Sequence, residues 1–345
     1  MVYRAKSCHL TRDPAGPMII SRTPLRISFF GGGTDYPGHY EEHGGEVLST
    51  TIDQYLYITV NKLSPFFNHR IHVGYSRSEL VNEVDEIQHP SVRCCLNHLQ
   101  IARDIEIFVM SDLPARTGLG SSSAFTVGLL QSLHAFKHNL VSKDFLAREA
   151  IHVEQKVIQE RVGSQDQVAA AFGGFNHLYF NKKSLFRVEP LPLDPERKKT
   201  LHSHLMLFFT CISRSANDIV EEQCRKVKTN LGSLQEMQKQ VAEGARILCD
   251  KNRNLREFGE LLHEGWMLKK GLSSRISNTF VDDSYQRARQ HGAIGGKLLG
   301  AGGGGFLLLF APPERHQELR ASLPELMHVP FGFEEEGTRL VHFSK

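Results

Sequence analysis

Glycine is clustered in this chain, and each cluster stands beside an apolar segment. The clusters lie at residues 31–33, 118 and 120, 173–174 and 295–305. Glycine in regular structure costs about 1 kcal/mol relative to alanine, because its unfolded backbone has more freedom to lose. A run of glycines therefore indicates close approach of the backbone to a ligand or to another segment. For residues 300–305 the alternatives are contact with phosphate, contact with another loop, and a tight turn between domains.

The segments between the glycine clusters predict a mixture of strands and helices. Short runs of β-branched and aromatic residues predict strands at residues 18–30, 47–63, 105–110, 205–212 and 306–310. Helices are expected from Ser121 to about residue 138, after the Ser142 cap, along the amphipathic stretch 220–248, and at 254–270 and 281–290. At roughly 150 residues per domain, 345 residues favour two domains. The boundary expected near residue 200 gives domains 1–200 and 201–345.

Charge and cysteine content narrow the classes of partner. Lys and Arg number 41 against 38 Asp and Glu, a net charge of +3 without long like-charged runs. This weak bias disfavours nucleic acid and membrane surfaces and favours a small-molecule partner. The apolar run 306–311 is far shorter than the ~20 residues that span a bilayer, and the N-terminus lacks the pattern of a signal peptide. Six cysteines without C-x-x-C spacing fit reduced thiols in a cytoplasm, and a homodimer is left open.

The segment from Leu113 to Ala124 is the first candidate for a site. It reads Leu-Pro-Ala-Arg-Thr-Gly-Leu-Gly-Ser-Ser-Ser-Ala and leads into a predicted helix. The first backbone N–H groups of a helix have no partner within it, and the helix dipole favours an anion there. The segment is therefore expected to hold phosphate, although it lacks the lysine of the common phosphate loop. An ordinary glycine-serine turn with a serine cap is the alternative.

Two acidic residues stand out by their surroundings. The neighbours of Glu154 one helical turn away are all apolar, so its carboxylate lies on or beside an apolar face. A cation with oxygen ligands would offset the cost of burying this carboxylate. The alternative is a carboxylate at the edge of the apolar stripe that reaches water or an arginine. Asp166 follows a glycine turn, where an acid serves either as a base or as a helix cap.

Three segments taken together resemble the motifs of one superfamily of kinases. They are residues 25–36, Leu-Arg-Ile-Ser-Phe-Phe-Gly-Gly-Gly-Thr-Asp-Tyr, residues 113–124, and residues 297–305, Lys-Leu-Leu-Gly-Ala-Gly-Gly-Gly-Gly. In this order they are similar to the three motifs of the galactokinase, homoserine kinase, mevalonate kinase and phosphomevalonate kinase (GHMP) superfamily. Within it, residues 21–36 resemble the branch of bacterial D-glycero-D-manno-heptose 7-phosphate kinases and related fucose kinase domains. The resemblance implies an α+β fold of two domains, one like a domain of ribosomal protein S5 and one ferredoxin-like, with ATP and acceptor in the cleft between them.

The resemblance also implies which residues bind ATP and its metal. The loop of the second motif would wrap the ATP phosphates with Pro114, Gly118, Leu119, Gly120, Ser121, Ser122 and Ser123. Ser122 and Glu154 would bind Mg²⁺. This role would explain why a carboxylate stands on an apolar face. The third motif contributes three consecutive glycines, Gly302, Gly303 and Gly304.

For the transfer itself, the resemblance implies roles for three charged residues. Asp166 would face the acceptor hydroxyl and accept its proton. Arg26 would lie between Asp166 and the transferring phosphoryl group, where a cation neutralises charge. Asp35 would hydrogen-bond hydroxyls of the sugar.

The acceptor is expected to be a sugar phosphate. Where galactokinases carry Glu-His before Thr-Asp-Tyr, this chain has Gly32 and Gly33, which opens space for another carbon and a phosphate. Arg214 is the candidate partner of that phosphate, because Ser-Arg-Ser-Ala at 213–216 follows a predicted strand and opens a helix.

The expected function is therefore ATP- and Mg²⁺-dependent phosphorylation of the anomeric hydroxyl of D-glycero-D-manno-heptose 7-phosphate, giving a 1,7-bisphosphate for nucleotide-activated heptose synthesis. The alternatives are a fucokinase or another sugar 1-kinase, and a sensor that binds ATP and sugar without turnover.

Overall fold

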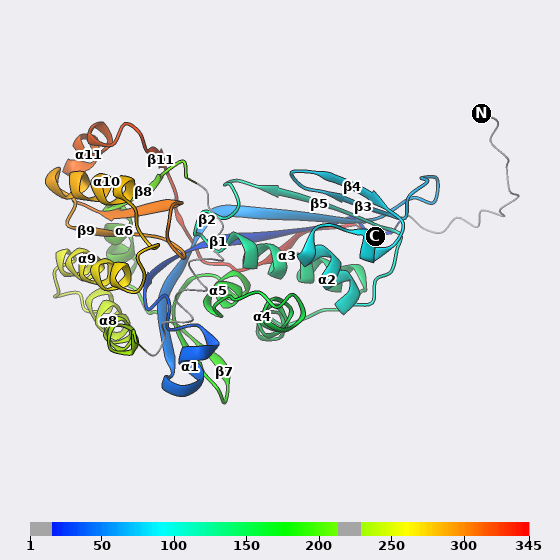
Figure 1. Ribbon diagram of the computed structural model, residues 1–345, viewed down its shortest axis with the longest axis horizontal. Coiled ribbons are helices and arrows are strands. Elements are labelled where there is room, and N and C mark those ends of the chain that lie inside the picture. The colour runs from blue at the N-terminus through cyan, green and yellow to red at the C-terminus, as the bar shows by residue number, and fades with distance from the viewer. Residues whose placement is uncertain (1–15, 213–228, 345) are drawn as a thin grey trace, which may run out of the picture.

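The computed structural model describes residues 16–212 and 229–344, which form two lobes (Figure 1). The first lobe is built on a nine-stranded sheet and the second on a four-stranded sheet. Within the described ranges, no helix is both long and apolar enough to cross a membrane. This mixture of sheets and helices in two lobes confirms the α+β fold that the sequence predicts.

The sheet of the first lobe runs in the order β13-β1-β2-β5-β3-β4, and β6 and β12 also pair with β2. Its main strands are β1 (Ile19–Phe30), β2 (Gly45–Lys62), β3 (Ile71–Gly74), β4 (Ser78–Val81), β5 (Ile105–Ser111), β6 (Phe175–Asn181) and β7 (Leu185–Pro190). All of the pairings are antiparallel except that of β3 with β5. The strands expected at 18–30, 47–63 and 105–110 are thus β1, β2 and β5.

Four helices gather along one side of the long strands (Figure 1): α2 (Pro90–His98), α3 (Ser121–Phe136), α4 (Lys143–His152) and α5 (Gln165–Phe172). Helix α3 begins at the residue that the sequence predicts, and nearly every side chain on it is buried. Two short helices complete the lobe, α1 (Pro37–His43) and the 3₁₀ turn η1 (Val84–Glu86). A π-helical turn, η2 (Val153–Val157), continues α4 and carries Glu154.

The second lobe has an antiparallel sheet in the order β11-β8-β10-β9. Its strands are β8 (Leu205–Phe209), β9 (Gly295–Leu298), β10 (Phe306–Phe310) and β11 (Met327–Val329). Its helices are α6 (Pro195–Ser203), α8 (Leu231–Cys249), α9 (Arg256–Gly271), α10 (Thr279–Gln290), the turn η3 (Pro313–Arg315) and α11 (His316–Ser322). Every residue of β10 is fully buried, as its continuous apolar sequence predicts for a central strand.

The end of the chain returns to the first lobe. Strand β12 (Phe333–Glu334) pairs with β2, and β13 (Arg339–Phe343) pairs with β1. The expected division into 1–200 and 201–345 does not account for these strands, which belong to the first sheet. The reason is physical: an unpaired edge of β1 would expose a row of free N–H and C=O groups, and a distant segment covers it.

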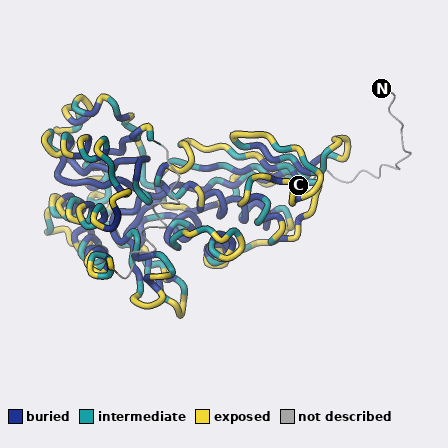
Figure 2. The backbone as a smooth tube through the Cα atoms, viewed as in Figure 1, coloured by how far each residue is buried: buried dark blue, intermediate teal, exposed yellow. Residues whose placement is uncertain are grey.

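Aromatic side chains join the two lobes. The ring of Phe29, on β1, stacks on Phe175 at 5.3 Å and meets the edge of Phe258, on α9, at 5.4 Å. The ring of Phe30 also packs on Phe258, at 5.2 Å. Figure 2 shows buried backbone continuing from the long strands into the second lobe. The end of β1 is therefore fixed between the two lobes.

Candidate active site

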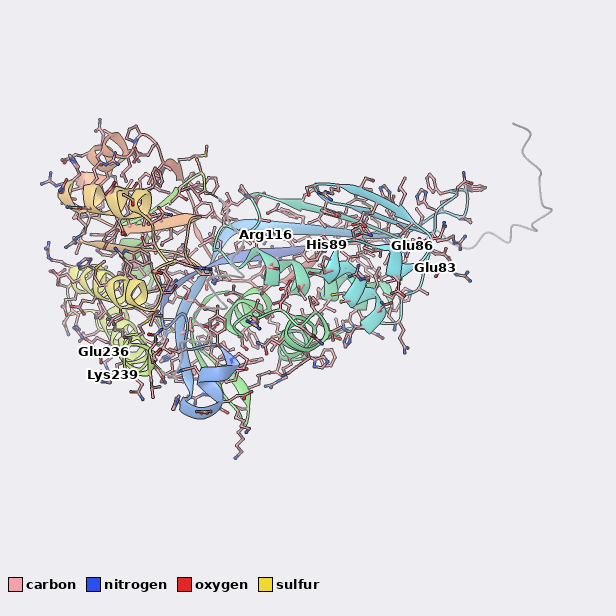
Figure 3. All side chains as sticks on the ribbon, in the orientation of Figure 1. Glu83, Glu86, His89, Arg116, Glu236 and Lys239 are labelled. Atoms are coloured by element: carbon pink, nitrogen blue, oxygen red, sulfur yellow. The ribbon has the colours of Figure 1, made fainter. Side chains whose placement is uncertain are left out.

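The loop between β5 and α3 forms one wall of a pocket between the lobes. Gly120 caps α3, and the serines at 121–123 form the first helical turn. These three serines line the pocket together with Gly118 and Gly120. The free N–H groups of that turn make the wall suited to an anion. Arg116, in the same loop, also lines the pocket, and its side chain is exposed (Figure 3).

Two residues expected at the ATP phosphates support the loop and do not line the pocket. Leu119 is fully buried, and its carbonyl accepts the backbone N–H of Arg26 at 3.0 Å. The carbonyl of Pro114 accepts the hydroxyl of Thr117 at 2.8 Å. Both residues thus contribute a carbonyl to the hydrogen bonds that shape the loop, and their contact with ATP stays a prediction.

The glycine run of the third motif packs against this loop. A Cβ on Gly300 would lie 2.3 Å from the Cα of Gly118, so neither position has room for a side chain. Gly302 and Gly304 also line the pocket, whereas the N–H of Gly303 donates to the Ile276 carbonyl at 2.9 Å. Contact with another loop, one of the alternatives from the sequence, thus accounts for part of the run, and three of its glycines, Gly300, Gly302 and Gly304, line the pocket.

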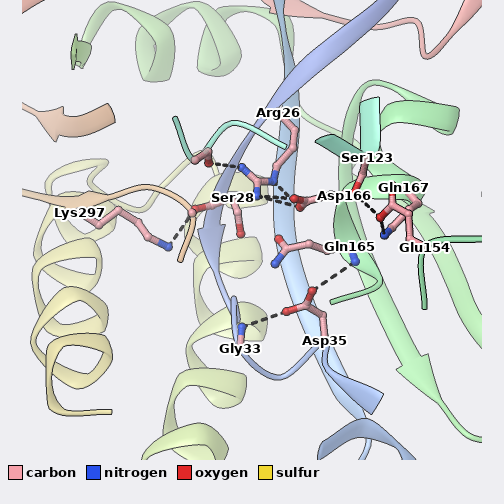
Figure 4. Close-up of polar contacts among 12 residues, drawn as sticks. Arg26, Ser28, Gly33, Asp35, Ser123, Glu154, Gln165, Asp166, Gln167 and Lys297 are labelled. Carbon is pink, nitrogen blue, oxygen red and sulfur yellow. Dashed lines mark hydrogen bonds and ion pairs between the residues drawn. The ribbon is translucent and has the colours of Figure 1, made fainter. Parts of the chain in front are cut away.

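Arg26 and Asp166 meet at the centre of the pocket, although 140 residues separate them in the sequence. Arg26 Nε donates to Asp166 Oδ1 at 2.8 Å and Nη2 donates to Oδ2 at 3.0 Å (Figure 4). Arg26 Nη1 donates to the Gly118 carbonyl at 2.7 Å. Strand alternation points Arg26 and Ser28 into the pocket while Leu25, Ile27 and Phe29 fill the core. Asp166 lies in the first turn of α5, where the dipole favours an acid.

Glu154 lies directly behind the phosphate loop. Its Oε2 accepts hydrogen bonds from Ser123 Oγ at 2.9 Å and from Gln167 Nε2, whereas its Oε1 is buried and has no partner among the described residues. The side chain is 1 % exposed, and burial raises the pKa of Glu154 to about 7. An unpartnered, buried carboxylate oxygen fits a hard cation. Ser123 contacts Glu154, and Ser122 presents an exposed side chain to the pocket.

Asp35 forms the opposite wall. It is 1 % exposed, and its carboxylate accepts the backbone N–H groups of Gly33 at 3.0 Å and Gln165 at 3.3 Å. Burial raises the pKa of Asp35 above its usual range. Gly32 and Gly33 line the same wall, next to Ser28 and Gln165. The pocket therefore has a wall of helix N-terminal amides suited to an anion, the Arg26–Asp166 pair, and a polar wall with open space.

Comparison with known proteins agrees with this arrangement. The family model of the GHMP kinases N terminal domain matches residues 90–174, and that of the GHMP kinases C terminal matches residues 237–329. Together these matches cover just over half of the chain. The chain belongs to the GHMP kinases.

Individual relatives of this GHMP kinase extend along nearly the whole chain. The D-glycero-alpha-D-manno-heptose 7-phosphate kinase of Campylobacter jejuni is 29% identical over 338 residues, which is 93% of this chain and 98% of the relative. The bifunctional fucokinase/GDP-fucose pyrophosphorylase of Arabidopsis thaliana is 26% identical over 89% of this chain, which spans 31% of that longer protein. The crystal structure of a D-glycero-D-manno-heptose 1-phosphate kinase from Bacteroides thetaiotaomicron has a TM-score of 0.76 at 24% identity and covers 95% of this chain and 100% of that one.

Sequence reasoning missed two lysines that line the pocket of this GHMP kinase, Lys269 on α9 and Lys297 on β9. A signal for Lys269 was available, because it stands in the apolar stripe of Leu262, Trp266 and Leu272 much as Glu154 stands in its own. Lys297 is the first residue of the third motif, and nothing in that glycine-rich sequence singles out the lysine. Arg214, the expected partner of a substrate phosphate, lies outside the described residues.

Proposed function

We propose that this GHMP kinase transfers the γ-phosphoryl group of ATP to the anomeric hydroxyl of D-glycero-D-manno-heptose 7-phosphate. The product would be the 1,7-bisphosphate, a precursor for nucleotide-activated heptose synthesis. The observation that carries the proposal is the Arg26–Asp166 pair, which joins the phosphate loop to the wall that carries Asp35. The match to the Campylobacter jejuni heptose 7-phosphate kinase along almost its full length supports the choice of sugar.

The pair has the chemistry that the transfer requires. The bond between the γ-phosphorus and the β-phosphate oxygen breaks, a bond to the acceptor oxygen forms, and the acceptor loses a proton. Asp166 is the proton acceptor, held in orientation by the two hydrogen bonds from Arg26. The guanidinium beside it neutralises negative charge that the phosphoryl group spreads over its oxygens.

Ser122 and Glu154 would hold Mg²⁺. The unpartnered Oε1 of Glu154 supports this assignment, because a buried carboxylate without enough donors gains from a cation. When bound, Mg²⁺ neutralises charge on the ATP phosphates. Ser123 and Gln167 donate hydrogen bonds to the other oxygen of Glu154, Oε2, and so fix the orientation of the carboxylate.

A fucokinase is the second candidate, because the Arabidopsis thaliana relative is similar over most of this chain. The open wall at Gly32 argues for an acceptor longer than a hexose. A sensor without turnover is disfavoured, because Arg26, Asp166, Ser122 and Glu154 are all present around one pocket or directly behind it.

The test is a panel of acceptors with ATP and Mg²⁺, in which ADP release is measured for heptose 7-phosphate, the unphosphorylated heptose, fucose, galactose and mannose. We expect the highest kcat/KM for heptose 7-phosphate. A higher value for fucose would replace the proposal with a fucokinase, and ATP binding without turnover of any acceptor would favour the sensor.

A further inference from the structure

Two lysines from the second lobe enter the pocket without a carboxylate partner. Lys269 is 6 % exposed and Lys297 is 5 % exposed. Among residues 16–212 and 229–344, no carboxylate forms an ion pair with either ammonium group. An unpaired buried charge costs several kcal/mol, so a protein rarely retains one without a use for it.

Main-chain carbonyls hold both amines in place. Lys297 Nζ donates to the carbonyls of Ser28 at 2.9 Å and Phe29 at 2.7 Å. Lys269 Nζ donates to the carbonyl of Gly300. Each ammonium group has three N–H donors, so one donor of Lys297 and two of Lys269 have no partner among the described residues.

Positive charge exceeds negative charge in this part of the pocket. Arg26 and Asp166 neutralise each other through their two hydrogen bonds. Asp35 is then the other carboxylate whose charge acts on Lys269, whereas the charges that act on Lys297 are those of Lys269 and Arg26. The remaining carboxylate that lines the pocket, Glu160, interacts with Arg116. Burial lowers the pKa of Lys269 to about 8 and that of Lys297 well below its usual range, as expected for amines whose charge is not compensated. A bound anion would supply the missing charge.

Two further polar atoms in the same wall lack partners. Ser28 Oγ and Gln165 Oε1 are buried in side chains that are 5 % and 8 % exposed, and both residues line the pocket. The Cβ position of Gly32 lies 3.6 Å from Ser28 Oγ and 3.7 Å from Gln165 Nε2. The carbonyl of Ser28 also accepts Lys297. Of these two unpartnered atoms, the Ser28 hydroxyl can donate to an anion, and it lies beside the open space at Gly32.

We infer that Lys269 and Lys297 bind a phosphate dianion carried by the acceptor, an inference that rests on the proposed function. The ligand chemistry is a phosphate dianion, which could come from the acceptor or from ATP. The ATP phosphates already have the amides of the α3 N-terminus and the cation site at Glu154. Figure 4 shows Lys297 on the opposite side of the Arg26–Asp166 pair from Ser123 and Glu154, which favours the acceptor.

The test compares Lys269→Met and Lys297→Met with the wild-type protein on two acceptors, heptose 7-phosphate and the same heptose without phosphate. We expect each variant to lower kcat/KM for the phosphorylated acceptor by about tenfold or more, with less than about threefold change for the neutral one. The KM for ATP should stay unchanged. Calorimetric titration of heptose 7-phosphate without nucleotide should show a similar loss of affinity.

Lys270→Met is the matched control. It removes the next lysine on α9, which pairs with Asp282 at 2.6 Å and does not line the pocket. Melting temperatures check that the variants fold. If Lys297→Met does not fold, Lys269→Met carries the test, because its lost contact is a single carbonyl.

The outcomes separate the inference from the proposed function. If the wild-type protein prefers heptose 7-phosphate and the variants lower kcat/KM equally for both acceptors, the proposed function stands and the lysine site is wrong. A raised KM for ATP with unchanged affinity for the acceptor would assign the lysines to ATP and also overturn the inference. If the wild-type protein shows no preference for the phosphorylated acceptor, the proposed function fails first and the lysine site fails with it.

Discussion

One guanidinium connects the parts of the site at the scale of single residues. Arg26 donates to both oxygens of Asp166 and to the Gly118 carbonyl, so it uses the planar fork of donors that only arginine has. A lysine at this position could not donate two parallel hydrogen bonds to the two oxygens of Asp166. The orientation of Asp166, the proposed proton acceptor, and the position of the loop between β5 and α3 are therefore set by the same side chain.

Asp166→Asn tests the proton acceptor. The amide keeps the shape of the side chain and can still accept one hydrogen bond from Arg26, but it cannot accept the proton of the acceptor hydroxyl. We expect kcat to fall by about 10² or more, while the affinity for ATP is nearly unchanged. Steady-state kinetics and ATP titration measure the two quantities. Asp144→Asn, at an exposed aspartate paired with Arg148, is the control, and near-normal kcat in Asp166→Asn would make Asp166 structural.

Glu154 predicts a pH-dependent difference in stability. Its pKa is about 7 in the folded protein because of burial, against an ordinary value of 4.5. The folded state therefore binds more protons than the unfolded state between these values, so the contribution of this group to the free energy of unfolding falls as pH rises from about 4.5 to 7. The shift corresponds to about 3 kcal/mol in full.

The experiment compares unfolding of the wild-type protein and Glu154→Gln at pH 5 and pH 8 without Mg²⁺. Relative to the wild type, Glu154→Gln should be more stable at pH 8 than at pH 5, by about 3 kcal/mol at most. At pH 8, added Mg²⁺ should stabilise the wild type more than the variant. Ser122→Ala should also weaken this effect of Mg²⁺, and equal Mg²⁺ responses in all three proteins would remove the cation site.

At the scale of elements, the loop after β1 contains glycines with different roles. Gly33 has φ +112°, which a residue with a side chain rarely adopts. At Gly32, a Cβ would meet its nearest neighbours at ordinary contact distances of 3.6 and 3.7 Å. The sequence suggests that both glycines make space for the acceptor. The backbone conformation shows two different roles: Gly33 shapes the turn, whereas Gly32 leaves room beside Ser28 and Gln165.

This difference predicts opposite behaviour for two alanine variants. Gly33→Ala should lower the melting temperature and reduce all activities together, because it strains the backbone by about 1 kcal/mol or more. Gly32→Ala should fold normally, and Gly32→Glu should reduce turnover of heptose 7-phosphate far more than that of a shorter neutral sugar. The measurement is the ratio of kcat/KM for the two acceptors in each folded variant. A ratio that does not change from wild type to Gly32→Glu would contradict the steric role of Gly32.

Elements that rest on local patterns were predictable from the sequence, and contacts between distant segments were not. The start of α3 at Ser121 follows from the glycine turn before it, and the unusual place of Glu154 follows from its apolar neighbours. The cap of α3 is Gly120, without a side-chain hydrogen bond, so the serine cap that the sequence offered as an alternative is not formed. The pairing of β13 with β1 has no local signal, because Arg339–Phe343 is mostly exposed and so lacks the apolar pattern of a buried strand. The meeting of Arg26 with Asp166 was likewise expected through the family resemblance and not from the spacing.

At the scale of the whole molecule, the site depends on the packing of the two lobes against each other. The first lobe supplies Arg26, Asp35 and Asp166, and the second supplies Lys269 and Lys297. The contacts between them include the apolar rings at the end of β1 and the hydrogen bonds from Lys297 to the carbonyls of Ser28 and Phe29. The distance between the lysines and the transfer centre therefore depends on packing around Phe258, a residue that does not line the pocket.

Phe258→Ala tests this dependence, with Phe208→Ala as its matched control. Both phenylalanines are at most 1 % exposed, so each truncation should cost about 3–5 kcal/mol of stability. Phe258 packs on Phe29 and Phe30, whereas Phe208 belongs to the core of the second lobe. We expect both variants to melt at lower temperature, but only Phe258→Ala to raise the KM for the phosphorylated acceptor, because only that cavity lets the end of β1 shift against Lys297. Kinetics at a temperature where both variants remain folded decide the matter, since equal kinetic defects in the two would mean that packing between the lobes affects stability alone.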